Sequence, residues 1–519
     1  MESNITELVK LAAADKKSEL EVKVLVGQIH TREDAERVVR AIEEVTTGGF
    51  TEEHRATFSY PDGLRVVVLT PENIFKVCST DSFRNVDLVV ERKEKYFPQN
   101  GGTDTVDIPD FDMRVTLRKE EVLRKDFTGS PSDPKNHVRI LHRKSWKTAD
   151  KKYRIDLSLV KSKSGKMKTL SEILQGTPIY ELEIEVLERK GDVAKELLTI
   201  ANRLTAAHQQ SITPLSKVDI RKYKLEFESS RIPFLNPVTM VRRHIAPQLP
   251  HNILKGYTVT NKADGERSML VVARDRKLIR WTRKGTISWT GLTAKTDKHV
   301  GDVIDGEYLE SRNLFCIFDV YSYKGVKVSA LPLMTTDDDA PEKSRLGYAR
   351  LFVENLQNDF KIQVSPVPFR IETKLFLSGD GPVMETAIKR MLDTQFEYAT
   401  DGLIFTPKSS SVAPPAETRF DTWTTVYKWK PPHQNSIDFL VQLSKGESVY
   451  DPATLQKYTT GTLYVTRTPG TDIIYPCETM TGEYSAPRVP TSLGGDDTRV
   501  PAPFQPSSPK APDASRILI

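Results

Sequence analysis

The sequence of 519 residues has few of the features that mark exported or membrane-bound proteins. Its three cysteines, Cys78, Cys316 and Cys477, lie far apart and form no Cys-x-x-Cys pair, which argues against a disulfide framework or a zinc site. No stretch reaches about eighteen consecutive apolar residues, the length that a membrane-spanning helix requires. The N-terminus begins Met-Glu-Ser-Asn and lacks the basic flank and apolar run of a secretory signal. The sequence therefore predicts neither secretion nor insertion into a membrane.

The chain also lacks a strong excess of charge of either sign. Its 75 basic and 70 acidic residues give a net charge of +5, which is compatible with a polyanionic ligand but does not require one. The content of 38% hydrophobic and 28% charged residues is typical of a folded globular protein. At this length, ordinary domain sizes predict about three domains.

The first predicted domain spans residues 1–228 and consists mainly of strands. A capping box from Thr31 to Asp34 predicts a helix that runs to about Val45, and apolar periodicity predicts a second helix over residues 192–207. Polar and apolar residues alternate, as in strands, over residues 114–118, 138–143 and 153–158. Loops rich in Gly, Pro, Asp and Ser are expected near residues 98–110 and 127–136.

Two further domains are predicted after a linker near residues 229–237. Short strands dominate residues 238–432, with helical patterns near residues 343–356 and 384–393. The third domain, residues 433–519, begins with a strand-like segment and becomes rich in proline after Ser485. No internal repeat of the solenoid type is visible in the sequence.

The clearest functional signal is a lysine that is followed by an aspartate and a glycine. Lys262, Asp264 and Gly265 are expected in a turn between two strands, where the glycine permits a close approach of the backbone. Taken alone, this short pattern also fits an ordinary surface hairpin.

Four further segments follow the lysine motif in a fixed order. They are Asp-Gly-Glu at 305–307, an apolar run closed by a carboxylate at 315–319, Asp-Gly at 401–402 and Lys-x-Lys at 428–430. Together with the lysine motif, they resemble the covalent nucleotidyltransferase superfamily of capping enzymes and polynucleotide ligases, over about residues 250–431.

The resemblance implies a role for each matched residue. Lys262 would form a phosphoramidate with a nucleotide, Arg267 and Glu307 would contact the ribose side, and Phe318 would stack on the base. Ordinary core packing is the alternative for Phe318. Arg283 would add a phosphate contact. The set implied to bind the nucleotide is Asp264, Gly265, Arg267, Arg283, Glu307, Phe318, Asp401, Lys428 and Lys430.

Elementary chemistry explains why this pattern combines cations with a carboxylate. A lysine is nucleophilic only when neutral, and nearby cations such as Arg267, Lys428 and Lys430 lower a lysine pKa. The same cations would neutralise the charge that develops as pyrophosphate leaves. The Asp401 carboxylate would hold a divalent cation, Mg or Mn, against the phosphates.

Two glutamate-rich segments occur in the first domain. One contains Glu19 and Glu21, and the other contains Glu181, Glu183 and Glu185. Alternate residues of a strand share one face, so each segment places carboxylates side by side, where they repel unless a cation or water lies among them. A solvated sheet face is therefore the alternative interpretation. Both segments resemble the glutamate motifs of tunnel-type, metal-dependent RNA triphosphatases, which implies that these five residues bind Mg or Mn inside a barrel.

Basic residues on the neighbouring predicted strands fit the same interpretation. Arg114, Arg143 and Arg154 alternate with apolar residues and are predicted to face the lumen and bind a triphosphate, although a solvated surface is the alternative. The capping triphosphatases that use a cysteine nucleophile are excluded, because none of the three cysteines follows a histidine.

The combined expectation is an α+β multidomain protein. It comprises an N-terminal antiparallel β-tunnel, a central nucleotidyltransferase fold and an incomplete C-terminal OB-fold barrel. The barrel is expected to be incomplete, and the chain to be part of a longer polypeptide, because the family's terminal Arg-x-Asp-Lys segment is missing. No Gly-x-Gly-x-Gly loop of a methyltransferase is visible either.

The domain order resembles that of capping enzymes of large cytoplasmic DNA viruses. The implied reactions are removal of the γ-phosphate from 5′-triphosphate RNA, followed by transfer of GMP from GTP through Lys262 to the 5′-diphosphate end. Expected partners are the RNA, a methyltransferase domain or subunit and RNA polymerase. The expected location is the cytoplasm of an infected cell or the virion. The alternatives are an ATP-dependent polynucleotide ligase and an inactive RNA-binding scaffold.

Overall fold

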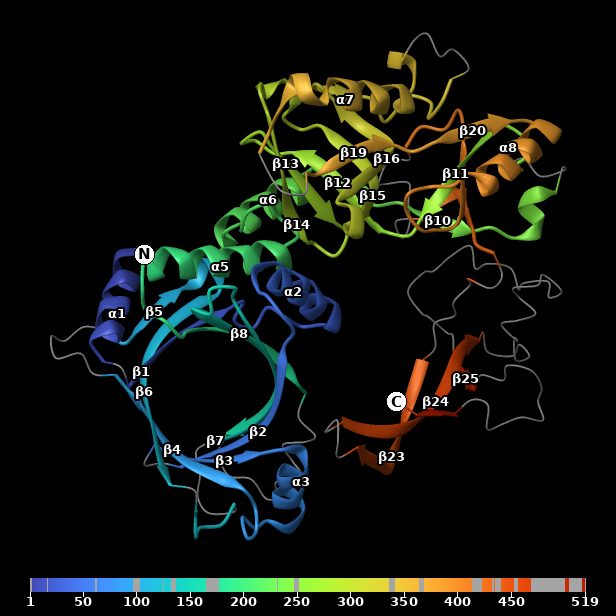
Figure 1. Ribbon diagram of the computed structural model, residues 1–519. Helices are drawn as coiled ribbons and strands as arrows, with labels where there is room; N and C mark the ends of the chain where they lie inside the picture. Colours follow the sequence, from blue (N-terminus) through green and yellow to red (C-terminus); the bar gives the residue numbers. More distant parts are fainter. Residues whose placement is uncertain are drawn as a thin grey trace. The chain divides into compact units, whose positions relative to one another are not determined.

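The computed structural model describes most of the chain as two compact units, mainly residues 1–218 and residues 219–444 (Figure 1). The described residues are 2–15, 17–60, 63–96, 103–124, 126–131, 137–164, 177–230, 232–246, 252–335, 341–363, 368–412, 422–431, 434, 440–451, 456–467, 500–503 and 516–518. Within these residues, none of the helices is both long enough and apolar enough to cross a bilayer.

The first unit is a closed barrel of eight antiparallel strands (Figure 1). Pairing of the first and last strands in the following order closes the ring. The order is β1 (Ser18–Val24), β9 (Ile179–Val186), β8 (Tyr153–Ser164), β7 (His137–Lys147), β2 (Thr51–Ser59), β3 (Leu64–Leu69), β4 (Leu88–Lys95) and β6 (Met113–Arg124). A short strand, β5 (Thr105–Ile108), pairs with β6 outside the ring.

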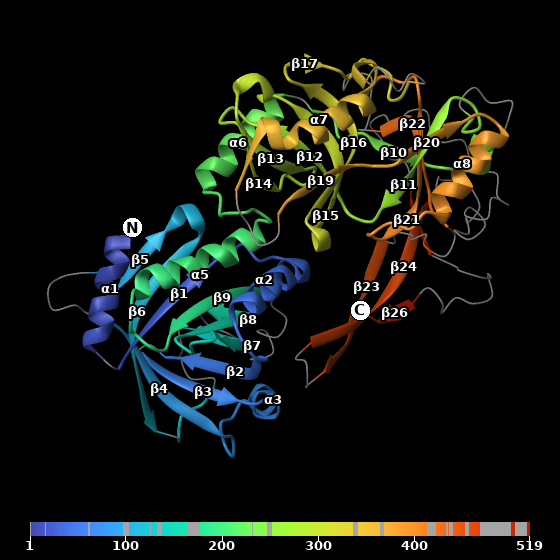
Figure 2. The same cartoon turned by 45° about the horizontal axis from the view of Figure 1, so that its top comes forward.

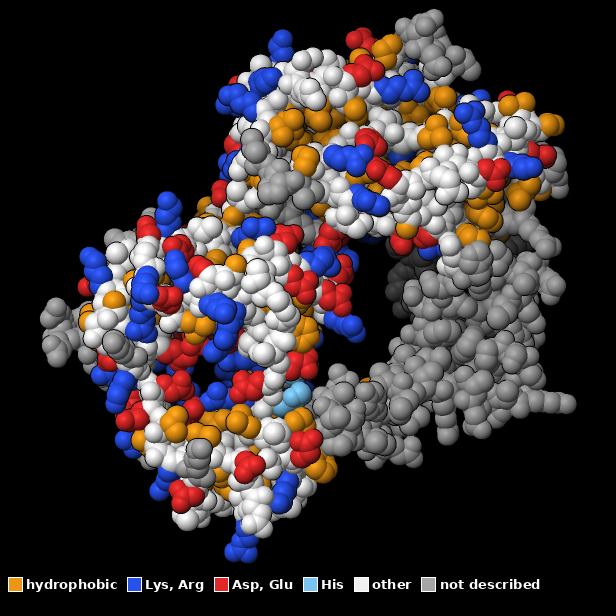
Figure 3. All heavy atoms as spheres, viewed as in Figure 1, with side chains coloured by type: hydrophobic (Ala, Val, Ile, Leu, Met, Phe, Trp, Pro, Cys, Tyr) orange, Lys and Arg blue, Asp and Glu red, His pale blue; other side chains and the backbone are white. Residues whose placement is uncertain are grey.

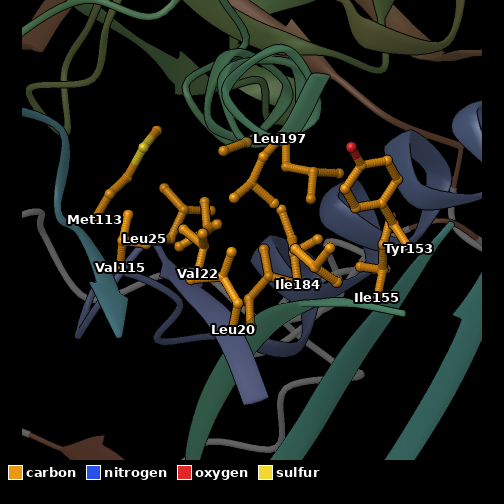
Figure 4. Close-up of a cluster of buried hydrophobic side chains, with 14 of the residues drawn as sticks. Leu20, Val22, Leu25, Met113, Val115, Tyr153, Ile155, Ile184 and Leu197 are labelled. Carbon is orange, nitrogen blue, oxygen red and sulfur yellow. The ribbon is translucent and has the colours of Figure 1, made fainter. Parts of the chain in front are cut away.

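Helices cover part of the outer surface of this barrel. They are α1 (Glu2–Ala14), α2 (Arg32–Val45) and α5 (Val193–His208), while α3 (Pro71–Thr80) packs on β2 and β3. Leu20 and Val22 of β1 and Ile184 of β9 pack against Leu197 of α5 in a buried cluster (Figure 4). Because side chains alternate along a strand, the residues between these apolar ones face the lumen. Burying one face on the helices therefore directs Glu19, Glu21 and their counterparts inward.

Several of the predicted elements of this unit are confirmed. Thr31 caps α2 with a complete capping box, and the helix ends at Val45. The helix predicted over residues 192–207 is α5, and the three alternating segments lie in β6, β7 and β8. The prediction of only two helices was wrong, because α1 and α3 are also present. Strand β5 lies inside the loop that was predicted near residues 98–110, and residues 132–136 of the second loop lie outside the described residues.

The second unit contains two sheets. The first has the order β10 (Asn236–Thr239), β22 (Thr422–Trp429), β21 (Thr400–Pro407), β11 (Tyr257–Ala263) and β20 (Phe376–Gly379). The second has the order β17 (Val326–Lys327), β16 (Leu314–Tyr323), β15 (Val303–Leu309), β12 (Glu266–Val272), β13 (Lys277–Thr282), β14 (Ile287–Ala294) and β18 (Phe360–Ile362), with β19 (Arg370–Thr373) beside β16. Residues 264–265 connect the two sheets.

Three α-helices belong to this part of the chain. They are α6 (Lys217–Ser229), α7 (Arg345–Asp359) and α8 (Pro382–Asp393), and Figure 2 shows α7 lying beside β16 and β19. Short 3-10 helices occur at Pro109–Phe111 in the first unit and at Arg242–Ile245, Asp297–His299, Glu310–Arg312 and Pro341–Lys343 in the second. The predicted helices near residues 343–356 and 384–393 are confirmed as α7 and α8.

A separate four-stranded sheet follows along the chain. It consists of β23 (Leu440–Asp451), β24 (Gln456–Arg467), β25 (Val500–Pro503) and β26 (Arg516–Leu518). Most of the segment at residues 436–441 lies outside the described residues. The incomplete OB-fold barrel and the three domain ranges remain predictions.

A buried ion pair stabilises the second unit, and its removal should be costly. The Arg345 guanidinium lies 2.6 Å from Asp319 and is fully buried, and it also donates to the carbonyl of Ser410, 2.5 Å away. We expect Arg345→Met to lower the free energy of unfolding by about 3–5 kcal/mol, because it leaves the Asp319 carboxylate buried without its partner. Urea unfolding would measure the loss. A change below about 1 kcal/mol would contradict the assignment, and Arg350→Met, at an exposed position on the same helix, is the control.

Candidate active sites

A pocket of about 220 Å³ in the second unit collects most of the residues of the predicted nucleotide site. Its wall combines Lys262 of β11 with Lys428 of β22 from one sheet, and Arg267 of β12 with Glu307 of β15 and Phe318 of β16 from the other. The two sheets thus bring together residues that are more than a hundred positions apart in the sequence. Leu235, Asn236 and Pro237 also line it, so the segment that was predicted to be a linker forms part of the wall.

Lys262 lies near the end of β11 rather than in the predicted turn. Its ammonium group donates to both oxygens of Asp401, at 2.7 and 2.8 Å, and the Lys430 ammonium group lies 2.6 Å from the same carboxylate. Burial alone would raise the pKa of Asp401, but the hydrogen bonds from the two lysines lower it. Asp401 therefore remains ionised between two cations.

Arg267 and Glu307 are neighbours on the paired strands β12 and β15. The Arg267 guanidinium lies 2.5 Å from the buried Asp305, and it donates to the carbonyl oxygen of Leu235. Burial raises the pKa of Glu307, although Lys374, Lys262 and Arg267 act in the opposite direction. The Glu307 carboxylate is thus held inside the pocket within the field of three cations.

The Phe318 ring lies in the pocket wall between two cations. The Arg267 guanidinium is 5.4 Å from the ring centroid and the Lys374 ammonium group is 5.8 Å from it. The ring is only partly buried and lines the cavity, so it offers a surface on which a planar base can stack.

Lys374 is a pocket residue that the sequence analysis missed. It is 8% exposed, and its ammonium group donates to the carbonyl oxygen of Asn261 at 2.9 Å. Burial lowers the pKa of Lys374, with Glu307 opposing the effect. The available signal was a lysine between strand residues 370–373 and 376–379. A lysine buried at such a position is costly unless it has a polar or charged partner, which indicates a site.

The connection between β11 and β12 explains the glycine of the lysine motif. A Cβ at Gly265 would lie 2.6 Å from the Tyr308 carbonyl oxygen, so no other residue fits without a shift of the backbone. Asp264 is exposed on this connection and does not line the pocket. Arg283 is exposed in the turn after β13 and also lies outside the pocket wall, so its predicted phosphate contact is not reflected in this arrangement.

Gly402 holds two strands of the site together, and a larger residue should disturb the chemistry. Its φ of +147° is unfavourable for other residues, and an added Cβ would lie 1.9 Å from the Trp429 carbonyl oxygen. We expect Gly402→Ala to displace Lys430 from Asp401 and to slow any reaction at Lys262 by about 10–100-fold. The rate of covalent labelling measures this. Gly49→Ala, where an added Cβ meets nothing within 4 Å, should leave the rate unchanged; equal rates in both variants would refute the expectation.

A second cavity, of about 450 Å³, occupies the lumen of the barrel. Figure 3 shows acidic and basic side chains together around the hollow of the first unit. The cavity brings together most of the residues that were predicted to bind a metal or a triphosphate. They are Glu19, Glu21, Glu183, Glu185, Arg143 and Arg154.

Glu183 is the most strongly paired of these carboxylates. Its oxygens lie 2.9 Å from the Lys23 ammonium group and 2.7 Å from the Arg143 guanidinium. Burial opposes ionisation, but these cations lower the pKa of Glu183 to about 2. Glu181 joins the same cluster through Lys23, at 3.2 Å, and Arg139, at 2.7 Å.

The other lumen carboxylates are less completely neutralised. Lys93 lies 2.7 Å from Glu19 and 3.8 Å from Glu21, while Glu185 is paired with Arg154. Burial raises the pKa of Glu185 to about 7; Arg154 opposes the rise, whereas Glu19 and the nearly buried Asp156 add to it. Asp156, which the sequence analysis missed, also lies 3.1 Å from Arg143 and 3.0 Å from Arg154.

The lumen carboxylates fit a hard divalent cation in chemical type. Glu21 and Glu185 are directly opposite each other on paired strands, and carboxylate oxygens are the ligands that Mg and Mn prefer. No group of three or more acidic, histidine or cysteine side chains is already arranged as a metal site among the described residues. Lys23, Lys93 and the lumen arginines lie between the carboxylates, so a cation would have to displace these partners.

Arg114 differs from the other predicted triphosphate ligands. Its side chain is 54% exposed, pairs with Asp107 at 2.6 Å and does not line the lumen cavity. Arg118, four residues further along the same strand, lines the cavity, as do Arg55 and Arg139. The alternation of β6 was therefore interpreted correctly, but the lumen position belongs to Arg118.

A comparison with protein-family models shows which enzymes this chain is similar to. Residues 201–432 match the family described as mRNA capping enzyme, catalytic domain. This chain is related to the mRNA capping enzymes. The matched range contains every residue that lines the nucleotide pocket, whereas the barrel glutamates lie before it.

Individual capping enzymes show a similar relationship at low identity. A probable mRNA-capping enzyme of Acanthamoeba polyphaga mimivirus is 24% identical, over 66% of this chain and 32% of the relative. An mRNA-capping enzyme of African swine fever virus is 22% identical, over 63% of this chain and 39% of the relative. The alpha subunit of the Neurospora crassa capping enzyme is 24% identical, over 41% and 54%. The chain thus spans about a third to about half of the length of these capping enzymes.

Two kinds of solved structure are similar to part of the chain. The mimivirus capping enzyme triphosphatase has 17% identity and a TM-score of 0.30, and covers 38% of this chain and 94% of its own. An RNA triphosphatase of S. pombe has 11% identity and a TM-score of 0.23, over 43% and 89%. These scores are too low to support an inference about the capping relationship.

Proposed function

We propose that this chain caps the 5′ end of RNA by two successive reactions. The barrel removes the γ-phosphate of 5′-triphosphate RNA, and the nucleotide pocket then transfers GMP from GTP to the resulting 5′-diphosphate end. The observation that carries the proposal is the pocket in which Lys262 and four further matched side chains line one cavity. The lumen, with its facing carboxylates and arginines, supports the first reaction.

In the transfer reaction, the Lys262 nitrogen attacks the α-phosphorus of GTP. A nitrogen–phosphorus bond forms, the bond between the α-phosphorus and the bridging oxygen breaks, and pyrophosphate leaves. Asp401 holds the Lys262 nitrogen in place until the nucleotide arrives, and it is the nearest group that can take the proton. Lys428, Lys430 and Arg267 neutralise the negative charge that develops on the phosphates.

In the second half of this reaction, GMP passes from Lys262 to the RNA end. A terminal β-phosphate oxygen of the 5′-diphosphate RNA attacks the GMP phosphorus, and the bond to Lys262 breaks. The lysine recovers its proton, and the RNA carries a 5′–5′ triphosphate cap. Phe318 provides the stacking surface for guanine, with Glu307 and Arg267 near the ribose.

In the barrel, water attacks the γ-phosphorus, the bond between the γ-phosphorus and the β–γ bridging oxygen breaks, and inorganic phosphate leaves. A divalent cation, Mg or Mn, bound by Glu19, Glu21, Glu181, Glu183 and Glu185 would polarise the γ-phosphate and activate the water. Arg143 and Arg154 hold the phosphate oxygens, and Asp156 keeps both guanidinium groups in position.

The setting of the reaction is also part of the proposal. Two of the relatives described above are encoded by viruses, which fits capping in the cytoplasm of an infected cell or in the virion. A methyltransferase domain or subunit would complete the cap, and RNA polymerase would supply the 5′-triphosphate RNA.

Conversion of one RNA through both steps tests the proposal. The chain is incubated with 5′-triphosphate RNA, α-labelled GTP and Mg or Mn, and the RNA is digested with nuclease. Release of labelled GpppN is the expected result. If 5′-diphosphate RNA yields labelled GpppN but 5′-triphosphate RNA does not, the barrel does not remove the γ-phosphate. Joining of RNA ends with ATP would favour the polynucleotide ligase.

A further inference from the structure

The two ends of the barrel lumen carry opposite charge. At one end, Ser59 of β2 pairs with Arg65 of β3 and with His137 of β7, and all three residues line the cavity. Further into the lumen, Arg139 lies two residues from His137 along β7, and Arg55 lies four residues from Ser59 along β2. Basic side chains and a hydroxyl group therefore surround this opening, which we call the Arg65 end.

The opposite end is acidic. A further cavity of about 530 Å³ is lined by Glu19, Glu120, Glu185 and Glu188. Glu19 and Glu185 line both this cavity and the lumen cavity, so the two cavities meet at these carboxylates. The two cations near it are already engaged: Lys190 pairs with Glu188 at 2.5 Å, and Arg189 donates to backbone carbonyls, including that of Asp15 at 3.1 Å.

The cations at the Arg65 end are not equally available to a ligand. Arg55 lies 2.8 Å from Glu91, and Arg139 lies 2.7 Å from Glu181. Within the described part of the chain, Arg65 forms no such ion pair. Burial lowers the pKa of His137, and Arg139 and Arg65 add to the effect, whereas Glu181 opposes it. Arg65 is thus a lumen guanidinium that pairs with none of the carboxylates among the described residues.

A γ-phosphate bound beside Arg143 and Glu183 lies out of reach of the Arg65 end, although Glu181 approaches that end through its ion pair with Arg139. His137 and Arg143 are six residues apart on β7, which corresponds to about 20 Å along a strand. A group at the Arg65 end would instead meet the part of a substrate that follows the triphosphate. In RNA, that part is the phosphodiester backbone of the first nucleotides.

We propose that the RNA chain enters the barrel through the Arg65 end, where Arg65 and His137 hold the backbone behind the 5′-triphosphate. This inference rests on the proposed triphosphatase function. The acidic end repels a polyanion and leaves the cations of the lumen to draw the 5′ end inward. Arg65 is then a specificity residue that distinguishes RNA from a free polyphosphate, because the latter reaches only the inner residues.

The test compares charge reversals at the two ends, with two substrates. Arg65→Glu should raise KM for a 20-nucleotide 5′-triphosphate RNA by about 10-fold and reduce the salt dependence of RNA binding by about one phosphate contact. It should leave kcat/KM for inorganic tripolyphosphate within about twofold. Lys190→Glu, an exposed charge reversal at the acidic end, should change neither KM for the RNA nor kcat/KM for tripolyphosphate. Arg65→Ala should show a smaller effect in the same direction.

Three outcomes would overturn this proposal. One is an equal loss for RNA and tripolyphosphate in a folded Arg65 variant, and another is a loss with RNA in Lys190→Glu alone. The third is unchanged binding of fluorescent 5′-triphosphate RNA to Arg65→Glu. The binding measurement needs no turnover, so it tests the entry route even where the wild-type chain hydrolyses neither substrate, a result that would refute the triphosphatase function itself.

Discussion

Replacing Lys262 by alanine is expected to abolish formation of the covalent GMP adduct, a loss of at least about a thousand-fold. The alanine removes the only atom that forms the bond to phosphorus in the proposed reaction, so no residual route remains through this pocket. The adduct is measured with α-labelled GTP after denaturation of the protein. Release of γ-phosphate from triphosphate RNA should be unaffected, because the barrel glutamates lie in the other compact unit.

A second lysine in the same region controls for non-specific labelling. Lys255 is exposed and lies two residues before β11, so Lys255→Ala changes a nearby lysine without touching the pocket wall. Its labelling should equal that of the unaltered chain. Retention of label in Lys262→Ala, or its loss in Lys255→Ala, would place the nucleophile elsewhere.

Removing Glu21 and Glu183 together should eliminate metal-dependent γ-phosphate release. The double variant Glu21→Ala, Glu183→Ala takes one carboxylate from each of two paired strands of the lumen. Loss of a bound cation that polarises the γ-phosphate is expected to cost about 3–4 kcal/mol of the activation barrier, which is roughly a hundred- to a thousand-fold in rate. Phosphate release at saturating Mg or Mn measures the effect.

This variant needs a control for folding, because Glu183 neutralises Lys23 and Arg143 in a nearly buried cluster. The adduct at Lys262 should form at the normal rate in a folded double variant. Glu183→Gln, which keeps the shape of the side chain, should show most of the loss with a smaller change in melting temperature. Glu94→Ala, at an exposed position of β4, should retain full release. Loss of both activities together would indicate misfolding, whereas normal release in a folded double variant would refute the lumen site.

The sequence predicted those parts of the two sites that depend on local pattern. Strand alternation indicated that Glu19 and Glu21 share a face, and that face lines the lumen because the alternate residues pack on α5. Arg267, Glu307 and Phe318, which line the nucleotide pocket, were instead assigned through the resemblance to the nucleotidyltransferase superfamily. Local periodicity is sufficient for the two glutamates because the buried face of their strand is fixed by its own apolar residues.

The residues that were missed depend on pairing between distant strands. Lys374 donates to the carbonyl oxygen of Asn261, more than a hundred residues away in the sequence, and Asp156 meets Arg143 only because β7 and β8 are adjacent. The neighbouring sequence can suggest that Lys374 is buried, but it does not indicate the partner of either residue. Arg114 shows the opposite case: its alternation matches the lumen face, but it pairs with Asp107 outside the cavity, and only the closed barrel reveals this.

The most direct test of the central claim is the nucleotide dependence of covalent labelling in the unaltered chain. The chain is incubated with Mg or Mn and either α-labelled GTP or α-labelled ATP, and the labelled peptide is then identified by mass spectrometry. The account predicts acid-labile label from GTP but not from ATP, on the peptide that carries Lys262. Label from ATP alone would identify a ligase-type enzyme, and label from neither nucleotide would contradict guanylyl transfer by this chain.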